Sequence, residues 1–177
     1  QALQSGQEIE IEGFTVIKPP PAPRVSITRL TAGKIVGLPE PVPVTPQALL
    51  GGAGLFSYVE FSGVIRSSRI ETDLDPHRLV LDFGPPDQRL SVRLARFNEE
   101  TVARLKPDTR VRVRGTALAW TSVNLQPYSI FVGVHDASQI DVMSEARQPA
   151  EATLVPVSEL VSTHPEGFDE RYERVRG

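Results

Sequence analysis

The sequence predicts an all-β fold with short helices, and three observations support this prediction. Apolar and polar residues alternate in several short segments, and this period of two is typical of strands with one buried face. Turn-forming residues, 13 glycines and 16 prolines among 177 residues, separate those segments. Similar strand patterns also recur far apart in the chain, which indicates copies of one unit.

Composition excludes several classes of protein. A hydrophobic content of 40% and a charged content of 23% are those of an ordinary globular protein. The net charge of −3 argues against a dedicated nucleic-acid-binding protein, which must neutralise phosphates, and against a polybasic membrane-surface protein. The lack of cysteine excludes disulfides and cysteine-ligated metals. No apolar run approaches the roughly 20 residues of a membrane helix, and we expect any signal or membrane segment to lie outside this chain.

The first elements are strands interrupted by proline. Residues 8–12 alternate Glu and Ile, so they predict a half-buried strand. Residues 19–23 hold four prolines and predict an extended polyproline segment. Alternation returns over residues 25–30, and residues 31–46, rich in glycine and proline, are predicted to be a linker.

A short helix is expected after this linker, over residues 45–50. Thr45 is a good N-cap, Pro46 suits the first helical position, and two glycines follow at 51 and 52. Residues 157–161 repeat the pattern and predict a second such helix, which Ser158 would cap.

The central part of the chain carries three strands, one helix and two strands. The first strand, residues 58–66, contains Gly63, where we expect a bulge or a sharp bend. The helix covers residues 98–105, with Asn98 as its N-cap and acidic residues in its first turn. The other strands are expected over residues 77–83, 90–94, 111–117 and 129–133, and residues 137–143 close the unit.

That order is the order of the oligonucleotide/oligosaccharide-binding (OB) fold, a five-stranded Greek-key barrel with a helix between its third and fourth strands. Closure of a barrel also explains how many short strands exist without long exposed edges. We therefore predict an OB-like five-stranded Greek-key barrel. The residues expected to face its interior include Leu79, Leu81, Phe83, Leu90, Val92, Leu94, Val111 and Val113.

Partial repeats of the same unit flank this barrel in the sequence. Residues 9–13 (Ile-Glu-Ile-Glu-Gly) are similar to residues 111–115 (Val-Arg-Val-Arg-Gly), and residues 43–63 are similar to residues 156–177. The unpaired strand edges of the two end segments are expected to pair, within the chain or between two copies. The predicted domains are residues 1–40, the C-terminal half of a preceding unit plus linker; residues 41–148, a complete unit; and residues 149–177, the start of a following unit.

No constellation for catalysis, a metal or a cofactor is apparent in the sequence. The three histidines, His77, His135 and His164, are far apart and lack partners at metal-ligand spacing. No serine lies in a nucleophile motif. We therefore expect no catalytic residue, no metal site and no cofactor in this chain.

Acidic and glycine-rich segments also have structural explanations. Asp73, Asp75 and Asp82 form a loose cluster that lacks the spacing of a calcium-binding loop, and Asp75 is typical of a turn before proline. Glu99 and Glu100 suit the first turn of a helix. Residues 51–54 are glycine-rich but follow a helix, which is the wrong order for a phosphate-binding loop.

One face of the barrel is a candidate for nucleic-acid or glycan binding, since OB barrels bind such ligands with aromatic and basic side chains. The alternative, a solvated strand face with aromatics packed into the barrel ends, is favoured by the small number of aromatic residues. It is also favoured because Glu10 and Glu12 occupy the positions in the first unit that match Arg112 and Arg114. The candidate residues are Arg93, Arg110, Arg112 and Arg114, with Trp120 and Tyr128 beside the loop between the last two strands.

Three groups of strand motifs carry a resemblance to a known family. They are residues 79–82 followed by 90–94, residues 111–115 followed by 128–132, and residues 156–160 running into 172–177. Together they resemble the tandem OB-like repeats in the extracytoplasmic sensor region of bacterial sensor histidine kinases, often hybrid ones, and of related diguanylate-cyclase receptors. The resemblance implies a periplasmic module tethered to the inner membrane, ahead of a membrane helix and a cytoplasmic signalling domain. No catalytic residue carries over.

Two functions follow as hypotheses. The first is a non-catalytic extracytoplasmic module of a bacterial signal-transduction receptor, which binds an unknown small ligand or protein and uses residues 31–46 and 146–152 as hinges. Its partners would be neighbouring repeats or a second copy of the chain, and nucleic acid is not expected. The alternative is a free-standing OB-fold module that binds single-stranded nucleic acid or oligosaccharide.

Overall fold

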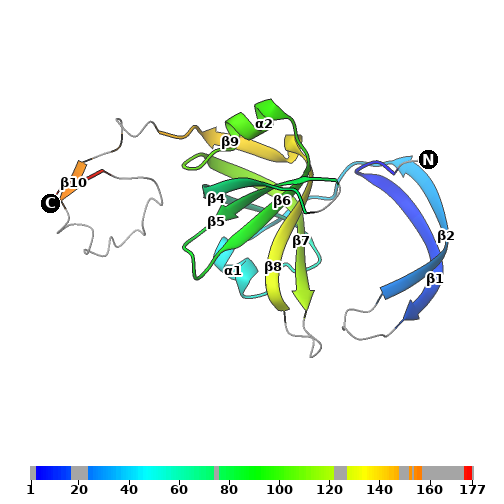
Figure 1. Cartoon of the computed structure of the whole chain (residues 1–177). Coiled ribbons are helices and arrows are strands. Elements are labelled where there is room, and N and C mark those ends of the chain that lie inside the picture. The colour runs from blue at the N-terminus through cyan, green and yellow to red at the C-terminus, as the bar shows by residue number, and fades with distance from the viewer. Residues whose placement is uncertain are drawn as a thin grey trace.

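The computed structural model describes most of the chain (Figure 1). The described residues are 3–16, 24–73, 76–121, 127–147, 152, 154–156 and 174–176. The predicted polyproline segment at residues 19–23, the predicted helix at residues 157–161, Asp75 and His164 therefore lie outside the described residues.

Strands dominate the structure, as predicted, and the helices are short. The helices are α1 (Pro46–Leu50), α2 (Glu99–Arg104) and the 3-10 turn η1 (Ala137–Gln139). Among the described residues, no helix has the length and apolar character needed to cross a membrane. The strands are β1 (Gln7–Val16), β2 (Arg24–Ile35), β3 (Val42–Pro43), β4 (Tyr58–Glu71), β5 (Arg78–Phe83), β6 (Leu90–Arg96), β7 (Arg110–Thr121), β8 (Pro127–Asp136), β9 (Ile140–Ser144), β10 (Leu154–Pro156) and β11 (Arg174–Arg176).

The central strands close into the predicted OB barrel. The N-terminal half of β4 pairs with β7, and its C-terminal half pairs with β5. The strands therefore form a closed ring in the order β4, β5, β6, β8, β7 and back to β4. The pairing of β6 with β8 is parallel, whereas the other pairings of the ring are antiparallel. Helix α2 connects β6 to β7, the position that the OB fold requires.

The two α-helices, α1 and α2, begin where the sequence indicates. The Thr45 hydroxyl accepts a hydrogen bond from the backbone N–H of Ala48 at 3.1 Å, and the Asn98 side chain accepts one from the N–H of Thr101 at 2.9 Å. Each cap satisfies a donor that the helix itself cannot pair. The short helices are thereby fixed at their N-termini.

Strands β4, β7 and β8 are longer than predicted, because they curve around the barrel and change partners along their length. Residues 58–64 of β4 pair with β7, and the rest of the strand pairs with β5. The bulge expected at Gly63 is wrong in position: the register shift falls between Ile65 and Ser67. Gly63 is instead required by packing, since a Cβ there would lie 2.9 Å from Cδ1 of Phe83.

The interior of the barrel is filled by the alternating apolar residues that the sequence predicts. Phe61 and Phe83 meet edge to face with ring centroids 5.3 Å apart. Fully burying a Val, Leu or Phe side chain contributes about 1.5–3 kcal/mol relative to exposure, so this layer accounts for most of the favourable energy of folding. The buried strand residues are Val59, Phe61, Ile65, Leu79, Leu81, Phe83, Leu90, Val92, Leu94, Val111, Val113, Ala117, Val132, Val134 and Ile140.

Two further pairs of strands flank the barrel. Strands β1 and β2 form a separate antiparallel hairpin, and β10 pairs with β11 in parallel. Strand β2 continues to Ile35, so the predicted linker at residues 31–46 begins later than expected. The predicted domain boundaries at residues 40 and 148 stay predictions.

Candidate functional site

Two rows of residues cross the outer face of the sheet formed by β4, β5, β6, β8 and β7. Directly opposed residues on neighbouring strands point to the same side of a sheet, so each row shares one face. The first row is Ser67, Asp82, Ser91, Phe131 and Leu118, and the second is Arg69, Val80, Arg93, Gly133 and Thr116. This face is opposite to the one that lines the barrel interior.

Aromatic side chains occupy one end of this face. The rings of Trp120 and Phe131 stack with their centroids 6.0 Å apart and an angle of 29° between their planes. Phe131 is 8% exposed, whereas Trp120 is 49% exposed. The pair therefore presents a half-exposed indole ring that packs on a buried phenyl ring.

The guanidinium of Arg93 lies over Phe131, with Cζ 4.7 Å from the ring centroid. Such a cation–π contact contributes about 0.5–1 kcal/mol at exposed sites and more where water is excluded. The Nε atom of Arg93 is buried and has no hydrogen-bond partner among the described residues. Arg93 is thus packed on the aromatic ring with one buried donor that has no partner within the described ranges, and each such donor calls for an explanation.

Asp82 anchors the other end of the face. Its side chain is fully buried and accepts hydrogen bonds from the hydroxyls of Ser67 and Ser91, each at 2.7 Å, and from Arg69. Nη1 of Arg89 lies 3.6 Å from the same carboxylate. Because Arg69 and Arg89 remain half exposed, this carboxylate fixes two cations at the surface.

The ionisation state of Asp82 follows from these contacts. Burial raises the pKa of the Asp82 carboxyl, but hydrogen bonds from Ser67, Ser91 and Arg69 and the charge of Arg69 outweigh burial and hold the pKa below its ordinary value. Asp82 is consequently a carboxylate at neutral pH. We call Arg69, Asp82, Arg89, Arg93, Trp120 and Phe131 the outer patch.

The arginines expected on one face of the barrel point outward but lie along different strand pairings. Val92, Val111 and Val113 point inward, as that expectation required; Arg93 lies beside β8, whereas Arg112 and Arg114 belong to the half of β7 that pairs with β4 and β9. Strand β7 changes partners along its length, so its two halves contribute to different parts of the surface.

Arginines on that half of β7 form ion pairs with carboxylates of neighbouring strands. Nε of Arg114 lies 2.7 Å from Glu60 and its Nη2 lies 2.9 Å from Asp141. The Glu60 hydrogen bond in particular raises the pKa of Arg114. Arg112 lies 4.0 Å from Glu60, and Arg110 belongs to the same half of the strand. These arginines stabilise the junction of β4, β7 and β9.

The aromatic candidates differ in outcome. Trp120 lies on the outer face and stacks on Phe131, whereas the alternative prediction packs it into a barrel end. Tyr128 belongs to β8, but its side chain lies outside the described residues.

Of the three acidic residues that the sequence groups loosely, Asp73, Asp75 and Asp82, Asp75 lies outside the described residues. Asp73 is exposed, and Asp82 is buried among arginines and serines. No group of three or more His, Asp or Glu side chains that could hold a metal ion occurs in the described part of the chain. His77 is exposed, and His135 is half-buried.

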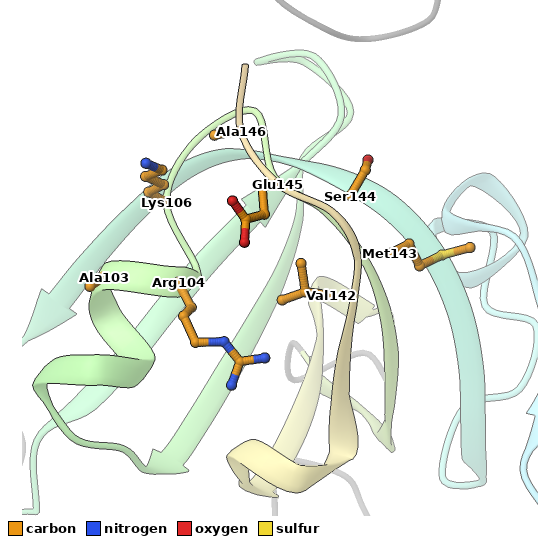
Figure 2. Close-up of a pocket in the computed structure, with 8 residues that line it drawn as sticks. All are labelled: Ala103, Arg104, Lys106, Val142, Met143, Ser144, Glu145 and Ala146. Atoms are coloured by element: carbon orange, nitrogen blue, oxygen red, sulfur yellow. The ribbon is translucent and has the colours of Figure 1, made fainter. Parts of the chain in front are cut away.

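A cavity of about 370 Å³ lies elsewhere, between α2 and β9 (Figure 2). Figure 2 shows Arg104 and Glu145 reaching into this space from the two sides. Its mixed charges and small apolar surface define no specific ligand, and it shares no residue with the outer patch. The lining residues are Ala103, Arg104, Lys106, Val142, Met143, Ser144, Glu145 and Ala146.

Sequence reasoning missed Arg69, Arg89 and Phe131. Arg69 lies beyond the predicted end of the first barrel strand, and Arg89 lies in the turn before β6. One signal was available: Asp82 is an acidic residue within β5, whose other central residues are all apolar. A carboxylate in such a strand requires buried cationic or hydrogen-bonding partners.

Comparisons with known proteins show neither a family nor a function for this chain. No family model matches the sequence, and no curated protein is similar to it. Among solved structures, the chain is similar to a protein assigned as an aspartyl-tRNA synthetase from Leishmania major Friedlin, with a TM-score of 0.44 and 10% identity over 68% of this chain and 25% of that chain.

Two structures from Entamoeba histolytica are similar to a comparable degree. The aspartyl-tRNA synthetase has a TM-score of 0.44 and 13% identity over 61% of this chain and 22% of its own, and the asparaginyl-tRNA synthetase has a TM-score of 0.42 and 16% identity over 64% of this chain and 26% of its own. The match spans about a quarter of each of those chains. The fold and the site therefore define this chain as an OB-fold barrel whose outer patch is rich in aromatic and arginine side chains.

Proposed function

We propose that this barrel is a binding module for single-stranded nucleic acid and that the outer patch is its contact surface. The observation that carries the proposal is the stack of Arg93, Phe131 and Trp120. Exposed aromatic rings bind bases of any sequence by stacking, which contributes about 1–3 kcal/mol per base. OB folds use the face of their second and third strands for such ligands, and those strands correspond to β5 and β6 here.

The charge of the outer patch supports the same ligand. Arg69, Arg89 and Arg93 contribute three positive charges, and Asp82 contributes one negative charge. The patch is therefore cationic although the whole chain has a net charge of −3. Local potential, rather than net charge, determines whether a phosphate backbone is attracted to a surface.

Nucleic acid is favoured over oligosaccharide by the kind of polar group present. An exposed Trp is a suitable platform for either ligand, but guanidinium groups match the geometry and charge of phosphate. Neutral sugars accept hydrogen bonds from guanidinium groups but gain no charge attraction from them. Oligosaccharide binding is retained as an outcome of the test.

The test is a titration of a dye-labelled oligothymidylate of about a dozen nucleotides, followed by fluorescence anisotropy at several salt concentrations. Binding should weaken with salt, with a slope of log K against log salt of about −0.7 per phosphate contacted. Arg93→Ala and Trp120→Ala should each weaken binding about tenfold or more. Arg104→Ala, which removes an exposed arginine from α2, should leave the affinity unchanged.

Two results would overturn the proposal. One is the absence of binding at low salt, and the other is binding that Arg93→Ala and Arg104→Ala weaken equally. Saturable binding of a neutral oligosaccharide, abolished by Trp120→Ala, would instead assign the face to glycans.

The hypothesis that this chain is a module of a bacterial signal-transduction receptor stays a proposal. It concerns the whole protein that contains the barrel, whereas the nucleic-acid proposal concerns the barrel itself. It is favoured by the strand pairs on both sides of the barrel, β1–β2 and β10–β11, which suit a tandem array. The full reading frame tests it: a membrane helix and a kinase or cyclase domain downstream would support it, and their absence would remove it.

A further inference from the structure

The β1–β2 hairpin has an apolar face that no other described strand covers. Its two strands form a sheet of their own. The register pairs Ile9 with Ala32 and Ile11 with Leu30, which places these side chains on one face. The large apolar residues Ile9, Ile11, Val25, Ile27 and Leu30 are all between 41% and 56% exposed.

This face corresponds to the inner wall of the barrel. In the sequence repeat, Ile9 and Ile11 match Val111 and Val113 of β7, both of which are fully buried. In the barrel, β4 lies along one edge of β7, and β9 and β8 lie along the other. The hairpin supplies the equivalents of β7 and β8, and among the described residues no strand pairs with the second edge of β1.

The other end of the chain supplies an equivalent of β4. Strand β3 pairs in parallel with the start of β4, and β10 also pairs in parallel with β11, in a register shifted by two residues from that of the repeat. The sequence repeat matches residues 58–63 with residues 172–177. Strand β11 is therefore the counterpart of the part of β4 that pairs with β7.

The charges on these counterparts are exchanged. In the barrel, Glu60 of β4 is opposite Arg114 of β7, and Ser62 is opposite Arg112. In the repeat, Arg174 and Arg176 stand where β4 has Glu60 and Ser62, while Glu12 and Glu10 stand where β7 has Arg114 and Arg112. The acidic residue is therefore on β4 in the barrel but on β1 in the repeat, and the basic residue is on β7 in the barrel but on β11 in the repeat.

We propose that β11 of a second copy of this chain pairs antiparallel with the free edge of β1. In the register of the barrel, Arg174 lies opposite Glu12 and Arg176 lies opposite Glu10, so both cross-strand pairs have opposite charges. The same register places Val175 opposite Ile11, as Phe61 is opposite Val113 in the barrel. Glu12 is 58% exposed despite its contact with Arg29 and so remains accessible.

The association joins different copies rather than the two ends of one chain. Figure 1 shows the β1–β2 hairpin and β10 on opposite sides of the barrel. Because the two surfaces in contact differ, the interaction is head to tail and extends to assemblies larger than a dimer. The inference is independent of nucleic-acid binding, since neither surface includes a residue of the outer patch.

The test is sedimentation equilibrium of the whole chain over a wide range of concentrations. The average mass should rise above 19.4 kDa with concentration. The double variant Arg174→Glu/Arg176→Glu, which leaves the hairpin untouched, should weaken association at least about tenfold, as should Glu10→Arg/Glu12→Arg, because each converts two attractive pairs into repulsive ones. The variant with all four substitutions should recover most of the association.

The control reverses two exposed acids on α2, Glu99→Arg/Glu100→Arg, and should leave association unchanged. Fluorescence of Trp120, the single tryptophan, verifies that the barrel is folded in each variant. A monomer of constant mass at every concentration would overturn the proposal. So would a variant with four substitutions that associates no better than either double variant.

Discussion

The guanidinium of Arg93 lies 4.7 Å from the ring centroid of Phe131, across two neighbouring parallel strands. Arg93 is opposite Gly133 in the register, and its guanidinium lies diagonally over the ring of Phe131, two residues from Gly133 on the same strand. Trp120 stacks on the same Phe131 from β7. A single buried ring thus positions both the cation and the exposed indole of the outer patch.

Replacing Phe131 tests this arrangement. Phe131→Ala should destabilise the barrel by about 2–4 kcal/mol, because Phe131 is 8% exposed and its removal leaves a cavity under Trp120. The emission of Trp120 should also shift to longer wavelength as water reaches the indole. Urea denaturation followed by tryptophan fluorescence measures both effects, and an unchanged emission maximum would contradict the stacking.

Replacing Asp82 tests the buried anchor. Asp82→Asn keeps the shape of the side chain but removes the charge that Arg69 and Arg89 share. We expect a loss of about 1–3 kcal/mol at pH 7, less than for a fully buried ion pair because both arginines are half exposed. Urea unfolding at pH 7 provides the measurement.

The stability of the wild-type protein should depend on pH through the same residue. The pKa of Asp82 in the folded state is below its ordinary value of 3.8, so its contribution is complete above about pH 4 and is lost as the pH falls through the folded-state value. The difference in unfolding free energy between wild type and Asp82→Asn should therefore shrink as the pH falls below about 4. A difference that grows on acidification would contradict the assignment.

Gly63 provides a test of close packing in the barrel. A Cβ at residue 63 would lie 2.9 Å from Phe83, so Gly63→Ala should cost about 1–3 kcal/mol through overpacking. Gly51→Ala is the matched control, because a Cβ there approaches no atom closer than 3.4 Å. Thermal unfolding of the two variants should separate them by several degrees, and equal melting temperatures would argue against the packing role of Gly63.

Replacing Arg114 distinguishes the role of the β7 arginines from the role of the arginines in the outer patch. Its ion pairs with Glu60 and Asp141 give it a structural role, so Arg114→Ala should lower stability by about 1 kcal/mol without changing oligonucleotide affinity. Arg93→Ala should have the opposite profile, with a small effect on stability and a large effect on affinity. Equal losses of affinity in the two variants would instead indicate that both groups of arginines contact the oligonucleotide.

Local patterns were sufficient to predict the fold. The alternation at Leu79, Leu81 and Phe83 gave the inward face of β5, and the caps Thr45 and Asn98 gave both helix starts. These features depend only on neighbours in the sequence. Long-range features were harder: the exchange of partners along β4 and β7 depends on the curvature of the closed barrel, which no local pattern records.

The outer patch was missed for the same reason. Arg69 and Asp82 meet only because β4 extends past Arg66 and pairs with β5, and Trp120 meets Phe131 only through the pairing of β7 with β8. The arginines of β7 were the more visible candidates because they alternate with valine in one short segment. Their carboxylate partners, Glu60 and Asp141, are distant in sequence.

The central claim is that bases stack on the outer patch, and the emission of Trp120 during titration with unlabelled oligothymidylate tests it most directly. Trp120 is the single tryptophan and is half exposed, so the signal arises from the proposed contact alone. We predict saturable quenching at low salt that is reversed by added salt and is weakened about tenfold or more by Arg93→Ala. Emission that stays constant up to high oligonucleotide concentration at low salt would contradict the account.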